Sequence, residues 1–322
     1  MTGPQSVDPQ SLARAPALRP GDRVGVLTVS SPVPQPLLDT GLDALRQAGL
    51  EPVVYSSARE AGTMRPYLAG DDALRAADLT DALTDPTIAG IVFARGGSGA
   101  QRTLAELDWS RPAGVPPKLL AGFSDVTAVL EAVAVKLGWA SVHSTNVATV
   151  AADPAAEYSF GSLLRTVLTP DQAMSLSFPD ASTVVGGRAR GVTLGGNLCL
   201  LTASLGTPTS RPAAGGILLI EDESEEDYRI DRMLTHLHRA GYLDGVAGII
   251  TGSFNNCGPP EDIAAILAER LGGLGVPMIS WVDIGHGGPN QAFPIGIAAE
   301  LDADARTLRL LDPPLVPAGE RP

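Results

Sequence analysis

The chain has 322 residues, of which 44% are hydrophobic and 18% are charged, and its net charge is −13. This length exceeds the roughly 250–300 residues at which a single core usually stops growing, so two domains are expected. An acidic chain is repelled by phosphate backbones and by anionic lipid surfaces, so neither nucleic acid nor a membrane is expected as a partner.

The N-terminal segment, residues 1–19, is polar with scattered apolar residues, and we expect it to be a loose tail. It has no apolar core of the kind found in signal peptides, and no apolar run approaches the ~20 residues that cross a bilayer. The two cysteines, Cys199 and Cys257, form neither a disulfide framework nor a zinc pattern. These features predict a cytoplasmic protein.

The first half of the chain alternates strand-like and helix-like segments. Short apolar runs predict strands at 23–29, 52–55, 89–94 and 119–123, and helical periodicity predicts helices at 36–49, 71–85 and 126–137. This alternation is typical of βαβ units. It predicts an α/β domain of the Rossmann or flavodoxin type, with a mostly parallel sheet and helices on both faces.

Turn signals and weak periodicity at 151–181 indicate a domain junction. The predicted elements after it are strands at 216–220, 246–251 and 277–281, helices at 228–241 and 261–271, and a hairpin formed by 298–301 and 307–311. We therefore expect an N-terminal domain at 1–165 and a smaller, mixed α/β C-terminal domain at 166–322.

Ser124 lies where the apolar strand 119–123 runs directly into a helix. Such a corner exposes a hydroxyl and directs helix N-terminal amides at whatever the hydroxyl attacks. The second glycine of the G-x-S-x-G nucleophile motif is absent, because Val126 stands there. A serine before Asp125 at a helix start is also an ordinary N-cap, so both interpretations stay open.

His286 is the best candidate for a general base among the four histidines. It lies between Gly285 and Gly287 just after a predicted strand, which leaves its ring accessible, although a loop histidine can also simply cap a turn. His236 and His238 lie in a helix rich in arginine and leucine and suit a solvated face. His143 ends a short strand and is either a structural hydrogen bonder or part of a pocket.

A histidine base needs a carboxylate that orients it. The acidic stretch 221–227 follows the buried strand 216–220, and Glu221 stands at the carboxyl end of that strand, where α/β active sites gather. Glu221 is the first candidate and Glu225 the second. The stretch could instead bind a metal, but it matches no calcium-loop pattern and has no HExxH partner.

The turn at 95–99 is rich in glycine and follows a predicted strand. It does not match the G-x-G-x-x-G pattern of dinucleotide-binding proteins. Its glycines allow a backbone to approach a substrate, so an amide of this turn could stabilise an oxyanion, or the segment could be a tight turn and nothing more.

Several motifs together resemble the serine LD-carboxypeptidases, a superfamily that also contains the microcin C self-immunity peptidases. The matching segments run collinearly from residue 18 to about 312 and lie at 18–22, 30–32, 94–97, 122–128, 194–198, 220–222, 228–234, 244–250, 285–287 and 294–296. Each segment is weakly specific by itself, whereas the whole set is highly specific.

The resemblance implies a triad in which Ser124 is the nucleophile, His286 the general base and Glu221 the orienting acid. It implies an oxyanion hole built from the amides of Gly97 and Asp125, in a site at the interface of the two domains. Residues expected to contact the substrate are Ser98, Asn197 and Glu225. No cofactor or metal is implied, and a homodimer is expected.

By this resemblance the protein is a serine carboxypeptidase that hydrolyses an L,D-peptide bond in murein tetrapeptides during cell-wall recycling. The alternative from the same superfamily is hydrolysis of the amide of an aminoacyl-nucleotide antibiotic, which confers resistance to microcins. A third hypothesis is a non-catalytic peptide-binding module in which Ser124 only caps a helix. The sequence departs from the family pattern at Ser98, Ser144, Glu223 and Ser224, which leaves the substrate open.

Overall fold

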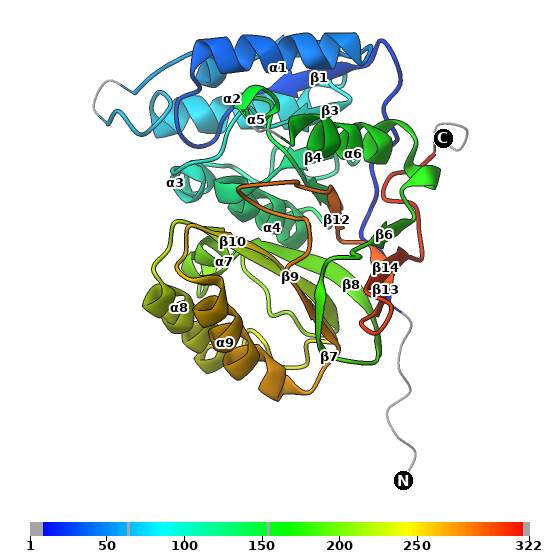
Figure 1. Ribbon diagram of the computed structural model, residues 1–322. Coiled ribbons are helices and arrows are strands. Elements are labelled where there is room, and N and C mark those ends of the chain that lie inside the picture. The colour runs from blue at the N-terminus through cyan, green and yellow to red at the C-terminus, as the bar shows by residue number, and fades with distance from the viewer. Residues whose placement is uncertain (1–8, 63–64, 153–154, 318–322) are drawn as a thin grey trace.

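The computed structural model describes residues 9–62, 65–152 and 155–317. Two sheets lie one above the other, and the helices pack around them (Figure 1). The fold is an α/β fold with a parallel N-terminal sheet and a mixed C-terminal sheet, as the sequence predicts.

The N-terminal sheet has six strands within the described residues, in the spatial order β12-β5-β4-β3-β1-β2. Its strands are β1 (Arg23–Val26), β2 (Glu51–Val54), β3 (Gly90–Val92), β4 (Leu119–Gly122), β5 (Ser141–His143) and β12 (Phe293–Ile295). Strands β1 to β5 are parallel, and β12 pairs antiparallel with β5. The order β2-β1-β3-β4-β5 is that of a flavodoxin-like sheet.

Helices cover both faces of this sheet because its strands are apolar on both sides. The helices of this region are α1 (Gln35–Gln47), α2 (Asp72–Thr84), α3 (Ala100–Ala105), α4 (Thr127–Lys136), α5 (Thr149–Ala152) and α6 (Ala156–Leu168). Leu38 and Leu42 of α1 pack with Leu163 of α6 on one face, while Leu79 of α2 and Val129 of α4 pack on the other.

The C-terminal sheet has eight strands in the described part of the chain, in the order β6-β14-β13-β8-β9-β10-β11-β7. The strands are β6 (Ser175–Ser177), β7 (Ser182–Val185), β8 (Arg188–Asn197), β9 (Gly216–Glu223), β10 (Gly248–Asn255), β11 (Met278–Ser280), β13 (Ala298–Asp302) and β14 (Thr307–Leu310). Strands β8 to β11 are parallel and the outer pairings are antiparallel.

Three helices, α7 (Leu198–Ser204), α8 (Asp227–Arg239) and α9 (Pro260–Leu271), cover one face of this sheet. The other face carries Ile217 and Leu219 and packs in one cluster with Phe293 and Ile295 of β12. Figure 1 shows β12 between the two sheets. The two sheets are therefore joined through a shared apolar core.

Three features of the fold differ from the expectations. Residues 9–19 are not a loose tail, because Ala17 and Leu18 are buried and Ala13 pairs with Trp139; residues 1–8 lie outside the described part. The predicted junction contains the helix α6. Its buried face includes serine and threonine, such as Ser162, so apolar periodicity did not reveal it.

The third difference concerns β12, which belongs to the predicted C-terminal domain by sequence and yet completes the N-terminal sheet. Three residues of strand carry little periodic signal, and pairing between distant segments has none. The domain boundary at residue 165 stays a prediction.

The contact between α1 and the segment before α5 gives a stability test. A Cβ at Gly41 of α1 would lie 2.1 Å from the carbonyl oxygen of Val147, whereas a Cβ at Gly161 of α6 would meet nothing within 4 Å. We predict that Gly41→Ala lowers the free energy of unfolding by about 1–3 kcal/mol through overpacking. Gly161→Ala, the matched control, should raise it by about 0.5–1 kcal/mol through helix propensity. Urea unfolding measures both, and equal effects would contradict the close contact.

Candidate functional site

The candidate site lies at the carboxyl ends of β1, β3 and β4. The order of the sheet reverses between β1 and β3, and ligands of open α/β sheets bind at such a switch point. Ser30 follows β1, the glycine-rich turn at 95–99 follows β3, and Ser124 follows β4. The sheet topology thus brings together three segments that are far apart in sequence.

Ser124 occupies a strained backbone position. Its φ is 66°, a conformation that non-glycine residues rarely adopt, and it begins a short 3-10 helix that leads into α4. Such strain is typical of a nucleophile at a sharp turn between a strand and a helix. Ser124 is the first residue of that 3-10 helix and Phe123 occupies the N-cap position, so the interpretation of Ser124 as a simple N-cap loses support.

The glycine-rich turn packs directly on Ser124. A Cβ added to Gly96 would lie 2.8 Å from Ser124 Cβ and 3.3 Å from the amide nitrogen of Asp125. Gly97 has a φ of 112° and leaves no room for a Cβ beside Ser31. Only glycine therefore allows this turn to approach the serine so closely.

Glu221 and His286 form a buried pair. Nδ1 of His286 lies 2.6 Å from Oε2 of Glu221, and the Glu221 side chain is fully buried. Glu221 lies in β9, where the sheet fixes its backbone, while His286 lies in the loop between β11 and β12. A Cβ at Gly285 would lie 2.7 Å from Glu221 Oε2, so glycine is needed for the loop to come this close.

The two partners shift each other's ionisation in opposite directions. Burial alone would raise the pKa of Glu221, but the charge and hydrogen bond of His286 outweigh it and hold that pKa below its ordinary value. Burial alone would lower the pKa of His286, but Glu221, with Glu223 and Asp222, raises it to about 9. The pair therefore favours a carboxylate beside an imidazolium.

The other ring nitrogen of His286 lies near Glu223. Nε2 lies 3.6 Å from Oε2 of Glu223, whose side chain is 41% exposed and accepts a hydrogen bond from Asn255. The His286 ring also stacks at a tilt on Phe123, with centroids 4.7 Å apart. Since Phe123 directly precedes Ser124, this contact joins the loop of His286 to the segment that carries Ser124.

The two candidate acids differ in what they contact. Glu221 pairs with His286, whereas Glu225 pairs with Arg229 in α8. The geometry therefore assigns the orienting contact to Glu221.

The remaining predicted residues fall into two groups. Gly97 and Ser98 are exposed at the turn, and the amide of Asp125 lies beside it. Asn197 is buried; its amide group donates to Asp222 and its oxygen accepts from Leu200 at the start of α7. Asn197 thus links β9 to the start of α7 beside Glu221. Its contact with a substrate stays a prediction.

Sequence reasoning did not find the contacts of Asp222 and Glu223. Asp222 is buried, and its pKa is raised to about 7 by burial and by the charge of Glu221. It accepts from the backbone of Cys199 and from Asn197, so it anchors α7 to β9. The only signal in the sequence was that Glu223 departs from the family pattern.

His143 is fully buried, and burial lowers its pKa to about 4, so its ring is neutral.

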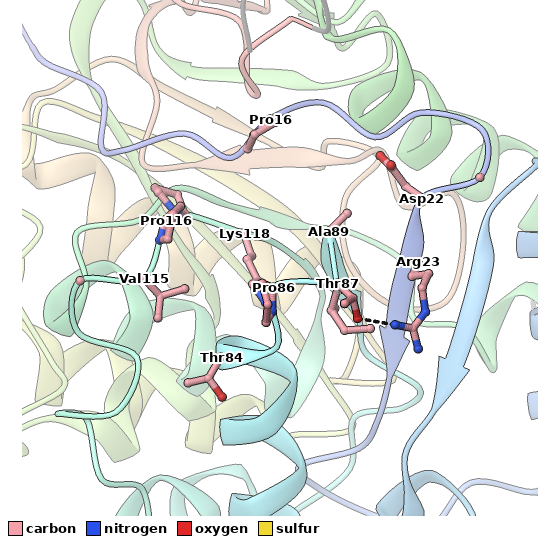
Figure 2. Close-up of a pocket in the computed structure, with 14 residues that line it drawn as sticks. Pro16, Asp22, Arg23, Thr84, Pro86, Thr87, Ala89, Val115, Pro116 and Lys118 are labelled. Atoms are coloured by element: carbon pink, nitrogen blue, oxygen red, sulfur yellow. Dashed lines mark hydrogen bonds between the residues drawn. The ribbon is translucent and has the colours of Figure 1, made fainter. Parts of the chain in front are cut away.

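A pocket of about 750 Å³ lies at the opposite end of the N-terminal sheet (Figure 2). Its lining includes Arg23, Ala89 and Lys118, at the amino ends of β1, β3 and β4. Lys118 donates to the backbone oxygen of Ala82, and the pocket holds no nucleophile with an adjacent base. The side chains at the carboxyl ends of the strands are therefore better suited to catalysis than those that line this pocket.

Neither a metal-binding cluster nor a membrane-crossing helix is found within the described residues. No group of three or more His, Cys, Asp and Glu side chains there could hold a metal ion, the acidic stretch included. No helix in that part of the chain has the length and apolar character needed to cross a membrane.

Comparisons with family models match both halves of the chain. The model described as the LD-carboxypeptidase N-terminal domain matches residues 24–144, and the model of the LD-carboxypeptidase C-terminal domain matches residues 190–301. The first match contains Ser124 and the second contains Glu221 and His286.

Individual proteins match over nearly the whole chain. A provisionally named carboxypeptidase of Streptomyces coelicolor is 45% identical over 311 residues, covering 96% of this chain and 100% of that protein. The murein tetrapeptide carboxypeptidase of Pseudomonas aeruginosa is 30% identical, covering 88% of this chain and 94% of its own. The structure of MccF bound to glutamyl sulfamoyl guanosine has a TM-score of 0.85 at 22% identity, covering 94% of this chain and 99% of MccF, which supports the fold.

The shifted pKa of His286 can be measured directly. We predict that NMR titration of its ring gives a pKa of about 9, while the His143 ring stays neutral down to about pH 4. Glu221→Gln should bring the His286 pKa down toward its ordinary value of 6.5, and Glu223→Gln should lower it less. Glu225→Gln is the matched control and should leave it in place, because Glu225 pairs with Arg229. A larger decrease in Glu225→Gln than in Glu221→Gln would move the orienting role to Glu225.

Proposed function

The chain belongs to the LD-carboxypeptidase family, and on this basis we propose that it is a serine peptidase that cleaves the L,D-peptide bond of murein tetrapeptides. We assign Ser124 as the nucleophile, His286 as the general base and Glu221 as the acid that orients the base. The observation that carries the proposal is the buried contact of 2.6 Å between Glu221 and His286, on a loop that packs against the residue preceding Ser124.

In the first half of the reaction, Ser124 Oγ attacks the carbonyl carbon of the scissile bond. His286 Nε2 takes the proton from Oγ, and the carbonyl oxygen becomes an oxyanion. When the intermediate collapses, the carbon–nitrogen bond breaks and His286 gives the proton to the leaving amine, which departs as the terminal D-amino acid. A water molecule, activated by the same histidine, then hydrolyses the ester on Ser124.

Glu221 supports this cycle because the imidazolium forms twice. Its carboxylate accepts the hydrogen bond from Nδ1, which keeps Nε2 free as the acceptor of the Ser124 proton. The pKa of about 9 means that the free protein holds His286 largely protonated at neutral pH. The activity of the free enzyme should therefore rise with pH as His286 loses its proton.

The oxyanion is stabilised by backbone amides. The amide of Asp125 follows Ser124 at the start of the 3-10 helix, and the amide of Gly97 lies on the turn that packs against the serine. Loss of one such donor costs about 2.7–4 kcal/mol of transition-state stabilisation in known hydrolases. The close approach of the glycine turn is what this assignment requires.

The substrate is proposed from the relatives. The Pseudomonas aeruginosa relative is named as a murein tetrapeptide carboxypeptidase, and a Bacillus subtilis relative, 34% identical, is named as a probable murein peptide carboxypeptidase. The structural likeness to MccF supports only the fold, so hydrolysis of an aminoacyl nucleotide is kept as an outcome of the test. The expected homodimer and cytoplasmic location stay predictions.

The test is hydrolysis of purified murein tetrapeptide, followed by mass spectrometry of the tripeptide and of free D-alanine. We expect release of D-alanine by the wild-type protein and a loss of about 10⁴-fold or more in Ser124→Ala. A parallel reaction contains glutamyl sulfamoyl guanosine as an aminoacyl-nucleotide mimic. If the protein cleaves only that compound, an aminoacyl nucleotide takes the place of the murein tetrapeptide as the proposed substrate. Turnover by Ser124→Ala near the wild-type rate would refute the triad.

A further inference from the structure

The side chain of Asp125 is buried behind the candidate oxyanion hole and bridges two segments. Its Oδ2 accepts a hydrogen bond of 2.6 Å from Ser30 Oγ and one of 2.8 Å from the amide of Ala100. Ala100 is the first residue of α3 and directly follows the glycine-rich turn. Asp125 thus ties the turn after β4 to the turn after β3.

A second pair of contacts ties the glycine-rich turn to the segment after β1. The hydroxyl of Ser31 accepts a hydrogen bond of 3.0 Å from the amide of Ser98, and the amide of Ser31 donates to Gly96 over 3.3 Å. Ser31 therefore holds the turn on one side, while Asp125 holds its other end through Ala100. Gly97 lies between these fixed points.

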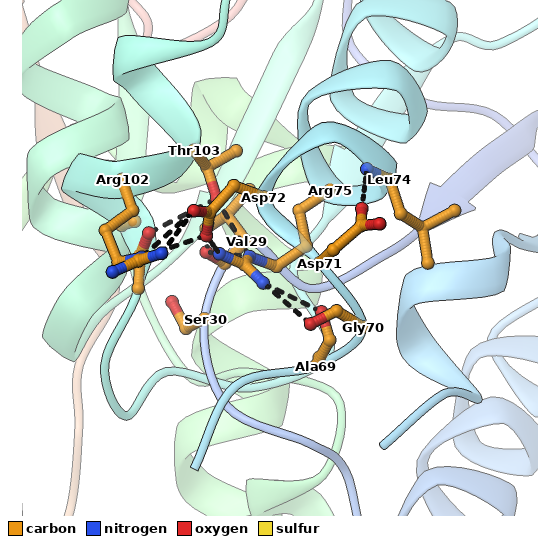
Figure 3. Close-up of polar contacts among 12 residues, drawn as sticks. Val29, Ser30, Ala69, Gly70, Asp71, Asp72, Leu74, Arg75, Arg102 and Thr103 are labelled. Carbon is orange, nitrogen blue, oxygen red and sulfur yellow. Dashed lines mark hydrogen bonds and ion pairs between the residues drawn. The ribbon is translucent and has the colours of Figure 1, made fainter. Parts of the chain in front are cut away.

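Arg75 connects the segment that precedes Ser30 to α3. The arginine is fully buried, and its Nε donates to the carbonyl oxygen of Val29 and to Thr103 of α3, over 3.2 Å and 3.0 Å. Its Nη1 donates to the oxygen of Ala69, whose amide in turn donates to Ser30 over 3.0 Å. Figure 3 shows the guanidinium among Val29, Ala69, Gly70, Asp72 and Thr103, with Ser30 beside it.

The charges of this cluster are complementary. A buried carboxylate is costly unless it is hydrogen-bonded and paired with positive charge. Burial raises the pKa of Asp125, while the bonds from Ser30 and Ala100 and the charge of Arg75 oppose that rise. Asp72 pairs with both Arg75 and Arg102, so the positive charge of the two arginines also has a carboxylate partner. A serine or a threonine in place of Asp125 could cap a helix but could not accept both bonds on one charged oxygen.

We propose that Asp125, Ser30 and Arg75 form a clamp that sets the separation between the amides of Gly97 and Asp125. The side chain of Asp125 is then a positioning residue for oxyanion stabilisation, separate from the role of its own amide. This inference rests on the proposed function, because it assumes that an oxyanion forms at Ser124. Its physical basis is that a displacement of about 1 Å in a catalytic group can cost 10²-fold in rate.

The test compares kcat and KM for murein tetrapeptide in three variants and a control. Asp125→Ala removes both hydrogen bonds, and we expect kcat to fall about 100-fold while KM changes less than about threefold. Asp125→Asn can still present one oxygen to Ser30 and Ala100, so it should keep at least about tenfold more kcat than Asp125→Ala. Ser30→Ala removes one bond and should fall between the two.

Ser11→Ala is the matched control. Like Ser30, Ser11 donates a hydrogen bond of 2.6 Å to a carboxylate, that of Asp312, and it also accepts one of 2.8 Å from the amide of Ala298 in β13. It should lower the melting temperature about as much as Ser30→Ala and leave kcat unchanged, because neither partner belongs to the clamp or to the candidate triad. Equal losses of kcat in Ser30→Ala and Ser11→Ala, or an effect of Ser30→Ala confined to KM, would overturn the clamp.

A second measurement separates the clamp from the substrate. If the wild-type protein does not cleave murein tetrapeptide, the proposed substrate is wrong, and the rate at which a fluorophosphonate labels Ser124 replaces kcat, because that reagent also places an oxygen in the oxyanion hole. The same order of variants supports the clamp. Wild-type labelling rates in Asp125→Ala and Ser30→Ala would overturn the clamp alone. No labelling of Ser124 in the wild-type protein would overturn both the nucleophile and the clamp.

Discussion

The buried pair of Glu221 and His286 is the interaction on which the candidate site depends. A fully buried carboxylate is stable only with a partner, and removing one partner of a buried pair commonly costs about 3–5 kcal/mol. The strand β9 fixes Glu221, so the pair also fixes the loop that carries His286 and its flanking glycines. That loop continues into β12, which completes the N-terminal sheet. The contact between Glu221 and His286 therefore links the candidate site to β12, the strand through which the two sheets are joined.

The part of the candidate site that carries Ser124 depends on a different constraint, which is close backbone packing. Ser124 has a strained φ, and the turn containing Gly96 and Gly97 packs against it where no side chain would fit. Strain of this kind persists only when the surroundings over-determine the backbone. The parallel sheet fixes the positions of these segments, because β1, β3 and β4 are neighbours and their carboxyl ends lie at the same edge.

Much of this arrangement could be predicted from the sequence, since the periodic strands and helices and the strand-end positions of Ser124 and Glu221 are local signals. The sequence also ranked Glu221 before Glu225, and the contact of Glu221 with His286 agrees with that order, but local sequence alone could not decide between the two acids because only the fold brings one of them to the loop. The return of β12, the packing of residues 9–19 and the approach of Glu223 to His286 are also contacts between distant segments. The helix α6 was missed because it buries serine and threonine where leucine is usual.

We propose Ser124 as a nucleophile that His286 and Glu221 activate. Mass spectrometry of peptides from protein treated with a fluorophosphonate, a reagent that modifies activated serines, tests this role. We expect one adduct, on Ser124, which forms at a rate that falls steeply in His286→Ala and in Glu221→Gln. Labelling of a different serine, or inactivation of the protein with Ser124 unmodified, would contradict it.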